Sequence, residues 1–166
     1  MELTPPAFRN ANRLNIGIIS DTHGLLRPEA LKSLSGSDVI LHAGDVGKES
    51  ILDELETMAP VFTVRGNVDY EYWCGRLPDQ LTLTLGGLTV YMIHDLAHFN
   101  QVDSENADLV VYGHSHKPET YELKGTTFLN PGSAGPRRFT LPVTLATLQW
   151  ETGQKILEPK LIRLIN

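Results

Sequence analysis

Five short apolar runs in this chain are each followed within three residues by aspartate, asparagine or histidine, and this pattern constrains the fold most. The runs cover residues 16–19, 39–41, 61–64, 90–93 and 109–112. Continuous apolar runs of this length are typical of strands buried on both faces of a sheet. Ligands of open α/β sheets bind just beyond the carboxyl ends of the strands. The sequence therefore predicts a ligand site built from these strand ends.

The residues at the strand ends offer seven nitrogen or oxygen donors, namely Asp21, His23, Asp45, Asn67, His94, His114 and His116. In extended chain, residues i and i+2 point to the same side, so the first two should face together, and so should the last two. Gly44 and Gly66 precede Asp45 and Asn67, where a residue without Cβ permits a tight turn and a close backbone approach. Nitrogen and oxygen donors suit manganese, iron, zinc, nickel or cobalt better than calcium or magnesium.

Each of these motifs also has an explanation that involves no metal. A single aspartate or asparagine after a strand is often a helix cap or a turn residue. A lone His-x-His pair can arise by chance on a surface. Capping does not require histidines at three separate strand ends, so the joint pattern favours a metal-binding cluster.

The first half of the chain alternates strands and helices. Pro28 opens a short helix that stops near Gly36, and residues 48–58 carry apolar side chains at helical spacing along one face. Strands are expected at 16–19, 38–41 and 61–64. This alternation predicts a largely parallel sheet with helices on its faces.

The second half reads as short strands separated by turns. Residues 81–85 and 88–93 flank Gly86-Gly87 and predict a hairpin, and residues 108–112 predict another strand. From residue 120 onward, β-rich pieces at 126–129, 143–148 and 156–165 follow. We find no repeat and no dividing linker. We therefore expect a polar N-terminal segment, residues 1–14, followed by one mixed α/β domain, residues 15–166.

Composition narrows the classes of partner. The 166 residues carry a formal net charge of −6, so a broad nucleic-acid or anionic-membrane surface is not expected. Cys74 is the single cysteine, which excludes an intramolecular disulfide. No apolar run approaches the ~20 residues that a membrane helix needs, and residues 1–14 do not resemble a signal peptide. We expect a cytoplasmic protein, and the sequence leaves open whether it forms a homo-oligomer.

The order of the motifs resembles the calcineurin-like metallophosphoesterases, and in particular their small bacterial and archaeal phosphodiesterase branch. The resemblance covers about residues 15–150 and includes the turn at residues 130–133, Asn-Pro-Gly-Ser. It implies a four-layer αββα sandwich of mixed sheets with a binuclear metal site. It also implies hydrolysis of a small phosphoester, most simply a phosphodiester, by a hydroxide that bridges the two metal ions.

The resemblance also implies the role of each donor. The first metal ion would bind Asp21, His23, Asp45 and His116. The second would bind Asp45, Asn67, His94 and His114, so that Asp45 bridges the pair. We expect two divalent transition-metal ions, with manganese as the first choice and iron, zinc, nickel or cobalt as alternatives. The residues expected to take part in catalysis are Asp45, Asn67 and Asp69.

Other residues near the motifs leave alternatives open. Asp69 can orient water or a ligand, or it can stabilise a turn. His42 resembles a residue that supports the metal ligands from behind, with a satisfied core histidine as the alternative. Arg137 and Arg138 can meet substrate phosphate or can simply face solvent. The substrate-binding residues are not identified by the sequence.

Two positions depart from the family pattern. Many members have a proton-donating histidine after Gly-Asn, where this chain has Val68, and this favours diesters or esters with good leaving groups. His94 is followed by Asp95 instead of glycine, and this carboxylate can be a ligand, can bind a basic partner or can hinder an anionic substrate. The alternative function is a non-catalytic interaction scaffold of the retromer-subunit type. The complete set of seven donors argues against it.

Overall fold

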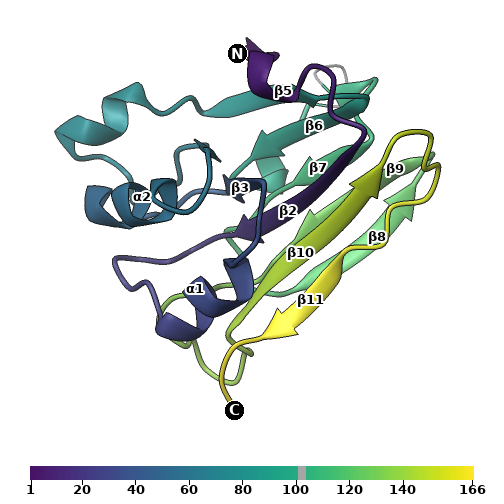
Figure 1. Ribbon diagram of the computed structural model, residues 1–166. Coiled ribbons are helices and arrows are strands. Elements are labelled where there is room, and N and C mark those ends of the chain that lie inside the picture. The colour runs from purple at the N-terminus through teal and green to yellow at the C-terminus, as the bar shows by residue number, and fades with distance from the viewer. Residues whose placement is uncertain (101–103) are drawn as a thin grey trace.

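The protein folds into two β-sheets that pack face to face, as a computed structural model shows (Figure 1). The structure describes residues 1–100 and 104–166. Two short α-helices, α1 (Pro28–Leu34) and α2 (Glu49–Glu56), accompany the sheets. The prediction of a two-sheet α/β sandwich is therefore confirmed.

The five-stranded sheet has the order β11-β10-β2-β3-β4. Its strands are β11 (Lys160–Arg163), β10 (Thr144–Glu151), β2 (Arg13–Ile19), β3 (Val39–His42) and β4 (Val61–Thr63). β2, β3 and β4 are parallel to one another, whereas β10 runs antiparallel to both of its neighbours. The parallel part is the one that the strand and helix alternation predicted.

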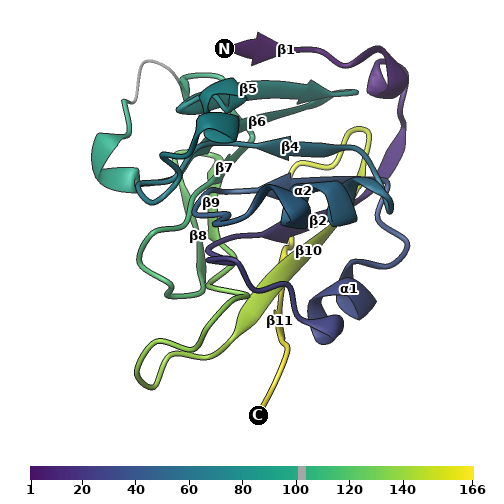
Figure 2. The ribbon, with the colours of Figure 1, turned by 90° about the vertical axis from the view of Figure 1, so that its left-hand side faces the viewer.

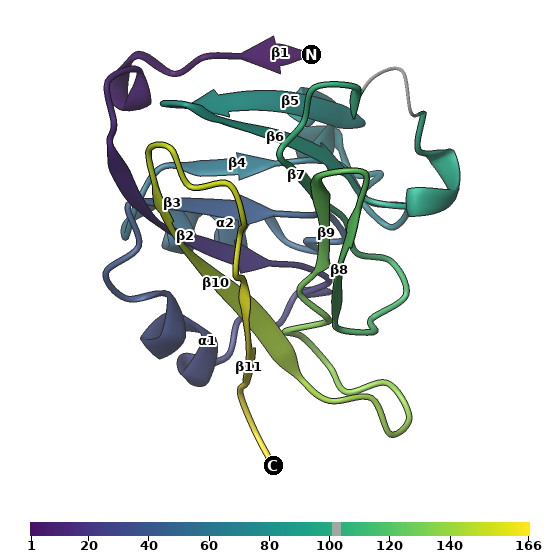
Figure 3. The ribbon, with the colours of Figure 1, turned by 90° about the vertical axis from the view of Figure 1, so that its right-hand side faces the viewer.

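The six-stranded sheet has the order β1-β5-β6-β7-β9-β8, and Figure 3 shows its β8–β9 end beside β10 and β11. Its strands are β1 (Glu2–Leu3), β5 (Gln80–Leu85), β6 (Leu88–Ile93), β7 (Leu109–Val111), β9 (Thr126–Asn130) and β8 (Glu119–Leu123). The predicted hairpin is β5–β6, and the pairing of Leu85 with Leu88 leaves the two glycines as its turn. β6, β7 and β9 are parallel, so the carboxyl ends of β6 and β7 lie together.

The main core lies between the sheets and is formed by alternate residues of each strand. Ile16 and Ile18 of β2 face Val90 and Met92 of β6 within one buried apolar cluster. The opposite residues of the five-stranded sheet, such as Ile40, pack under α1 and α2 (Figure 2). Because residues on both faces of β2 and β3 are buried, these strands read as continuous apolar runs in the sequence.

The outer face of the six-stranded sheet has a thinner cover. Tyr91, Val110 and Phe128 form an apolar cluster there, and Leu96 and Phe99 pack against it. In the described part of the chain this cover includes a 3₁₀ turn, η3 (Leu96–His98), where the αββα scheme has its second helical layer. Two further 3₁₀ turns are η1 (Pro6–Phe8) and η2 (Tyr72–Arg76).

The first residues of the chain take part in the sandwich, which the sequence pattern did not reveal. Glu2 and Leu3 pair with Thr82 and Leu83 of β5, and Phe8 joins the core between the sheets. Two residues are too short a run to give a period-2 signal. No helix in the described residues has the length and apolar character needed to cross a bilayer.

Candidate metal centre

The structure brings all seven predicted donors together where β2, β3, β4, β6 and β7 end. On one side, Asp21 Oδ1 lies 3.3 Å from His116 Nε2 and 3.7 Å from His23 Nε2. The two imidazole nitrogens are 3.2 Å apart. These three residues thus present their donor atoms to one point, although they come from opposite sheets.

A second set of donors meets at the side chain of Asn67. Its Oδ1 lies 3.1 Å from His94 Nε2 and 3.1 Å from His114 Nδ1. These residues follow β4, β6 and β7, so the second set also combines both sheets.

Asp45 lies between the two sets. Its Oδ2 is 3.5 Å from His23 Nε2 and 3.2 Å from His94 Nε2. The other oxygen, Oδ1, accepts a hydrogen bond from the backbone N–H of Val68 at 3.0 Å. The carboxylate is thereby held with one oxygen facing both groups of donors.

The hydrogen bonds around these donors fit divalent cations. Asp21 Oδ2 accepts from Ser20 Oγ and from the backbone N–H of His114, but Oδ1 is buried without a hydrogen-bond partner among the described residues. His94 Nδ1 lies 2.7 Å from the carbonyl oxygen of Ala43. This carbonyl can only accept, so the proton sits on Nδ1 and the Nε2 lone pair faces the centre, as in metal-ligating histidines. A buried carboxylate oxygen with no other partner beside oriented imidazoles suits a bound cation.

The charges of the donors are strongly coupled. Burial alone would raise the pKa of Asp21, but the neighbouring His116 and His23 imidazoles outweigh it and hold this pKa below its ordinary value. The pKa of His23 is raised, chiefly by Asp21. Burial acts to lower the pKa of His94, yet Asp45 and Asp21 raise it above the ordinary value. In the absence of metal, the fold therefore favours the protonated forms of His23 and His94.

The backbone of the centre adopts an unusual conformation. Five of the seven donor residues have φ between 45° and 71°, in the left-handed region, namely Asp21, His23, Asp45, His114 and His116. The expectation that Asp21 and His23 face together, and His114 and His116 likewise, because the chain is extended is therefore wrong. Asp21 and His23 do converge. His114 instead joins the set around Asn67, and His116 joins the set around Asp21. Aspartate and histidine tolerate this region better than most residues. Backbone hydrogen bonds from the Asp21 and His23 N–H groups to Gly44 and Asp45 fix the loop.

Two glycines are required where the loops touch, as the sequence predicted. A Cβ on Gly66 would lie 2.1 Å from Asp45 Oδ1, and one on Gly44 would lie 2.7 Å from His94 Nδ1. Gly113 is a third, since its Cβ would lie 2.5 Å from Asp21 Oδ2. At these three positions the donor residues lie so close to the backbone that a Cβ there would clash with them.

His42 is fully buried behind the centre. The backbone N–H of Gly44 donates to its Nδ1, so Nε2 carries the proton and faces Thr22 Oγ1 at 3.0 Å. Thr22 in turn donates to the carbonyl of Val46. Burial lowers the pKa of His42 to about 4, which keeps the ring neutral. The ring thus links the loop after β2 to the loop after β3, in agreement with a supporting position.

Asp69 connects two of the loops. Its Oδ2 accepts from the backbone N–H groups of Val46 and Gly66, and its Oδ1 accepts from Gly47. The side chain is buried, and three of its acceptor positions are used by backbone. Of the two roles considered for Asp69, this geometry favours turn stabilisation.

The turn at residues 130–133 supports the centre from the other sheet. Asn130 Nδ2 donates to the carbonyl of Gly113 and to Ser115 Oγ, on either side of His114. Ser133 Oγ donates to the carbonyl of Asp21. The sequence marked this turn only by resemblance, and the hydrogen bonds now give it a physical role.

The structure gives three further residues with open roles different surroundings. Asp95 Oδ1 caps η3 by accepting from Ala97 N, and Oδ2 lies 3.7 Å from His114 Nε2. Arg137 donates to the carbonyl of Asn166, away from the donors. Arg138 is exposed, and its charge acts against the raised pKa of His23. Arg138 is therefore the arginine whose field reaches the centre.

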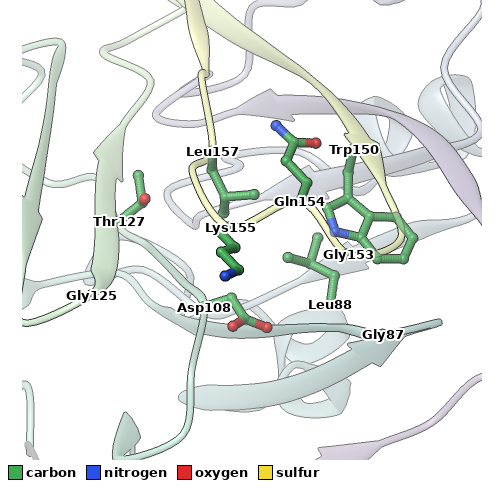
Figure 4. A pocket seen from close by; sticks show the side chains of 10 residues that line it. All are labelled: Gly87, Leu88, Asp108, Gly125, Thr127, Trp150, Gly153, Gln154, Lys155 and Leu157. Atoms are coloured by element: carbon green, nitrogen blue, oxygen red, sulfur yellow. The ribbon is translucent and has the colours of Figure 1, made fainter.

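A cavity of about 200 Å³ lies between the β5–β6 turn and the loop that connects β10 to β11 (Figure 4). Trp150, Lys155 and Asp108 point into it from three different segments. It contains none of the seven donors. Its lining offers no clustered metal ligands, so this cavity is separate from the candidate centre.

Comparison with known proteins gives a consistent result. The family model described as "Calcineurin-like phosphoesterase superfamily domain" matches residues 14–153. A "Probable metallophosphoesterase" of Methanothermobacter thermautotrophicus is 38% identical over 140 residues, which cover 76% of this chain and 81% of that protein.

Solved structures share the fold at lower sequence identity. A protein described as "a Novel Archaeal Phosphodiesterase" is 22% identical, with a TM-score of 0.73 over 90% of this chain and 100% of that chain. Vacuolar Protein Sorting 29 from Cryptosporidium parvum is 17% identical, with a TM-score of 0.74 over 91% of this chain and 98% of that chain. At these identities the likeness concerns the fold alone.

Proposed function

This chain belongs to the calcineurin-like phosphoesterase superfamily, and from that premise we propose that it is a phosphodiesterase that uses two divalent metal ions to hydrolyse a small phosphodiester. The observation that carries the proposal is the position of Asp45 Oδ2. This oxygen is 3.5 Å from a nitrogen of one donor set and 3.2 Å from a nitrogen of the other. One shared carboxylate between two donor sets suits a binuclear centre.

In this proposal the ions are divided as the resemblance implies. One ion is held by Asp21, His23, Asp45 and His116. The other is held by Asp45, Asn67, His94 and His114. Two divalent ions at such a site lower the pKa of bound water and stabilise negative charge on phosphoryl oxygens. Manganese is the first choice, with iron, zinc, nickel or cobalt as alternatives.

The chain itself orients the reacting groups. Asn67 turns its Oδ1 toward two imidazoles, so its amide nitrogen is the donor that it can offer to a phosphoryl oxygen. Hydrolysis forms one bond from a water oxygen to phosphorus and breaks the bond to the leaving alcohol. The alcohol then takes up a proton. Asp69 contributes by holding the loops of Asp45 and Asn67 in register.

A diester is the preferred substrate class because Val68 stands where many relatives have a proton-donating histidine. Its backbone N–H orients Asp45, but its side chain cannot protonate a leaving group. Positioned general acids typically contribute ~10²–10⁴-fold to the rate. Without one, diesters with stable leaving groups are the better substrates, and alkyl monoesters are poor ones.

A combined metal and substrate analysis tests the proposal. The protein is loaded with manganese, the bound metal is counted by elemental analysis, and hydrolysis of bis(4-nitrophenyl) phosphate is compared with that of 4-nitrophenyl phosphate and an alkyl monoester. We expect two ions per chain and the highest kcat/KM for the diester. At most one ion per chain, with every ester left intact, would contradict the proposal and favour the alternative of a non-catalytic interaction scaffold.

The role of Val68 is tested by restoring the histidine. Val68→His should raise kcat/KM for monoesters relative to diesters by about tenfold or more, since it supplies a proton donor. Val68→Leu is the matched control because it changes size without adding a donor. The measurement is kinetics on monoesters and diesters of graded leaving-group pKa. A wild-type preference for alkyl monoesters with little dependence on the leaving group would refute this explanation.

A further inference from the structure

A cavity of about 480 Å³ adjoins the second donor set. Asn67 and His94 line it together with Arg65, Asp95 and His98. Since two of the proposed metal ligands form part of its wall, a phosphodiester at the centre would extend one of its two ester arms into this cavity. The lining of the cavity should therefore select that arm.

The charges of the lining are not balanced. Arg65 makes an ion pair with Asp79, with its Nε 2.9 Å and its Nη2 2.8 Å from the same Oδ1, so these two charges compensate each other. Asp95 has no such partner among the described lysines and arginines. Its side chain is 26% exposed, and the Oδ2 atom lies 3.9 Å from His98 Nδ1 and 3.7 Å from His114 Nε2. Both distances exceed a hydrogen bond, so Oδ2 is available to a ligand.

A carboxylate in this place is unfavourable for most phosphoesters. It repels the phosphate group of the substrate, and in partly buried surroundings this repulsion is screened less than in open solvent. A positive charge on the ester arm reverses the effect, because the arm is then attracted to Asp95 while the phosphate faces the metal centre. The cavity and the centre together match a substrate with a negative and a positive group.

We propose that the preferred substrate is a phosphodiester in which one alcohol carries an ammonium group, and that Asp95 recognises this group. The inference rests on the proposed function, and it deepens it by naming the substrate class. Asp95 acts as a specificity-determining residue. The arm with the ammonium group stays on phosphorus, and the other alcohol leaves when its bond to phosphorus breaks.

Two isosteric diesters test the recognition. The two compounds are 4-nitrophenyl phosphocholine and 4-nitrophenyl 3,3-dimethylbutyl phosphate. Both release the same nitrophenolate. They differ only in the retained arm, which ends in a positively charged nitrogen in the first and in a neutral carbon in the second. At pH 8 and low ionic strength, the choline diester should have a kcat/KM about fivefold higher, as expected for one partly exposed ion pair. In Asp95→Asn the ratio should fall to about one. Asparagine keeps the cap on Ala97 N, so the fold of η3 is preserved.

The control variant is Asp53→Asn, which removes the same charge from an exposed position on α2 and should leave the ratio unchanged. Equal losses on both diesters in Asp95→Asn would mean that Asp95 only orients His114, and would overturn the inference. So would a wild-type ratio near one with normal turnover of bis(4-nitrophenyl) phosphate.

Calorimetry separates this inference from the proposed function. Binding of phosphocholine and of 3,3-dimethylbutyl phosphate to the manganese-loaded protein needs no turnover. Tighter binding of phosphocholine, lost in Asp95→Asn, supports recognition by Asp95 even if bis(4-nitrophenyl) phosphate is not hydrolysed. Equal affinities overturn the recognition, whatever the hydrolytic activity.

Discussion

At the scale of single residues, Asp45 has the most demanding position. One carboxylate oxygen faces both donor sets, and the other accepts the Val68 N–H. Burial acts to raise the pKa of Asp45, but the His94 imidazole and the Val68 N–H outweigh it and lower this pKa. The carboxylate is thus charged and fixed in orientation at neutral pH, which suits the shared ligand that we propose.

We predict that Asp45→Asn abolishes turnover and weakens both metal sites. Asparagine tolerates the left-handed backbone and can still accept the Val68 N–H, so the fold should persist while the shared negative charge is lost. The loss of kcat/KM should exceed the roughly 10–100-fold effect typical of a residue behind a ligand. Metal content and kinetics are the measurements.

His116→Ala provides the comparison for Asp45→Asn. His116 Nε2 faces only the first donor set, so its loss should weaken one site and leave the second ion bound. Retention of two ions and near-normal turnover in Asp45→Asn would show that Asp45 does not bridge them.

At the scale of elements, the loops after the strands make the centre, and glycines allow them to touch. Gly66→Ala would introduce a Cβ 2.1 Å from Asp45 Oδ1 and 2.2 Å from its backbone nitrogen. We predict a loss of about 1–3 kcal/mol in the free energy of unfolding, since backbone must move, together with loss of metal. Denaturant unfolding and elemental analysis measure the two effects.

The matched control for this substitution is Gly75→Ala in η2. A Cβ at Gly75 meets nothing within 4 Å, so the change should lie within about 0.5 kcal/mol of the wild type. Equal stability and metal content of the two variants would mean that the contact at Gly66 is not restrictive.

The loops of the centre also show which structural features the sequence predicts and which it does not. The strand ends and the seven donors follow from local patterns, because buried strands read as apolar runs and polar residues interrupt them. The left-handed conformation of Asp21 and His23 does not follow, since it depends on hydrogen bonds to Gly44 and Asp45 across another loop. The role of Asp69 was open for the same reason. Two of its three backbone partners, Val46 and Gly47, lie in a loop that only the fold brings beside Asp69.

At the scale of the whole molecule, metal binding, protonation and folding are linked. The pKa values of His23 and His94 are raised in the fold, so their protonated forms add stability below the ordinary histidine pKa, and this is lost as pH rises through the raised values. Asp21 and Asp45 have lowered pKa values, so their contribution is present above the ordinary carboxyl pKa and is lost as pH falls through the lowered values. Metal ions require neutral imidazoles, and they must displace these protons.

We therefore predict that the stabilisation by manganese grows between pH 6 and pH 8. At a free concentration of 100 Kd, a ligand that binds only the native state adds about 2.7 kcal/mol, which raises Tm by roughly 5–11 °C for a chain of this size. At pH 6 the increment should be smaller, because protons compete. Thermal unfolding with manganese or with a chelator, at both pH values, measures the difference. An increment that did not depend on pH would contradict the protonation of His23 and His94.

The three backbone hydrogen bonds to Asp69 are made by protein groups alone and involve none of the seven donor side chains. Together with the left-handed donor residues, they hold the loops in the arrangement that brings the seven donors together. Binding an ion consequently costs little ordering of the chain, and an ion can be exchanged for another of similar size without disassembly of the loops. In that case the identity of the proposed ions should depend on the supply of ions around the protein as well as on the affinity of the site.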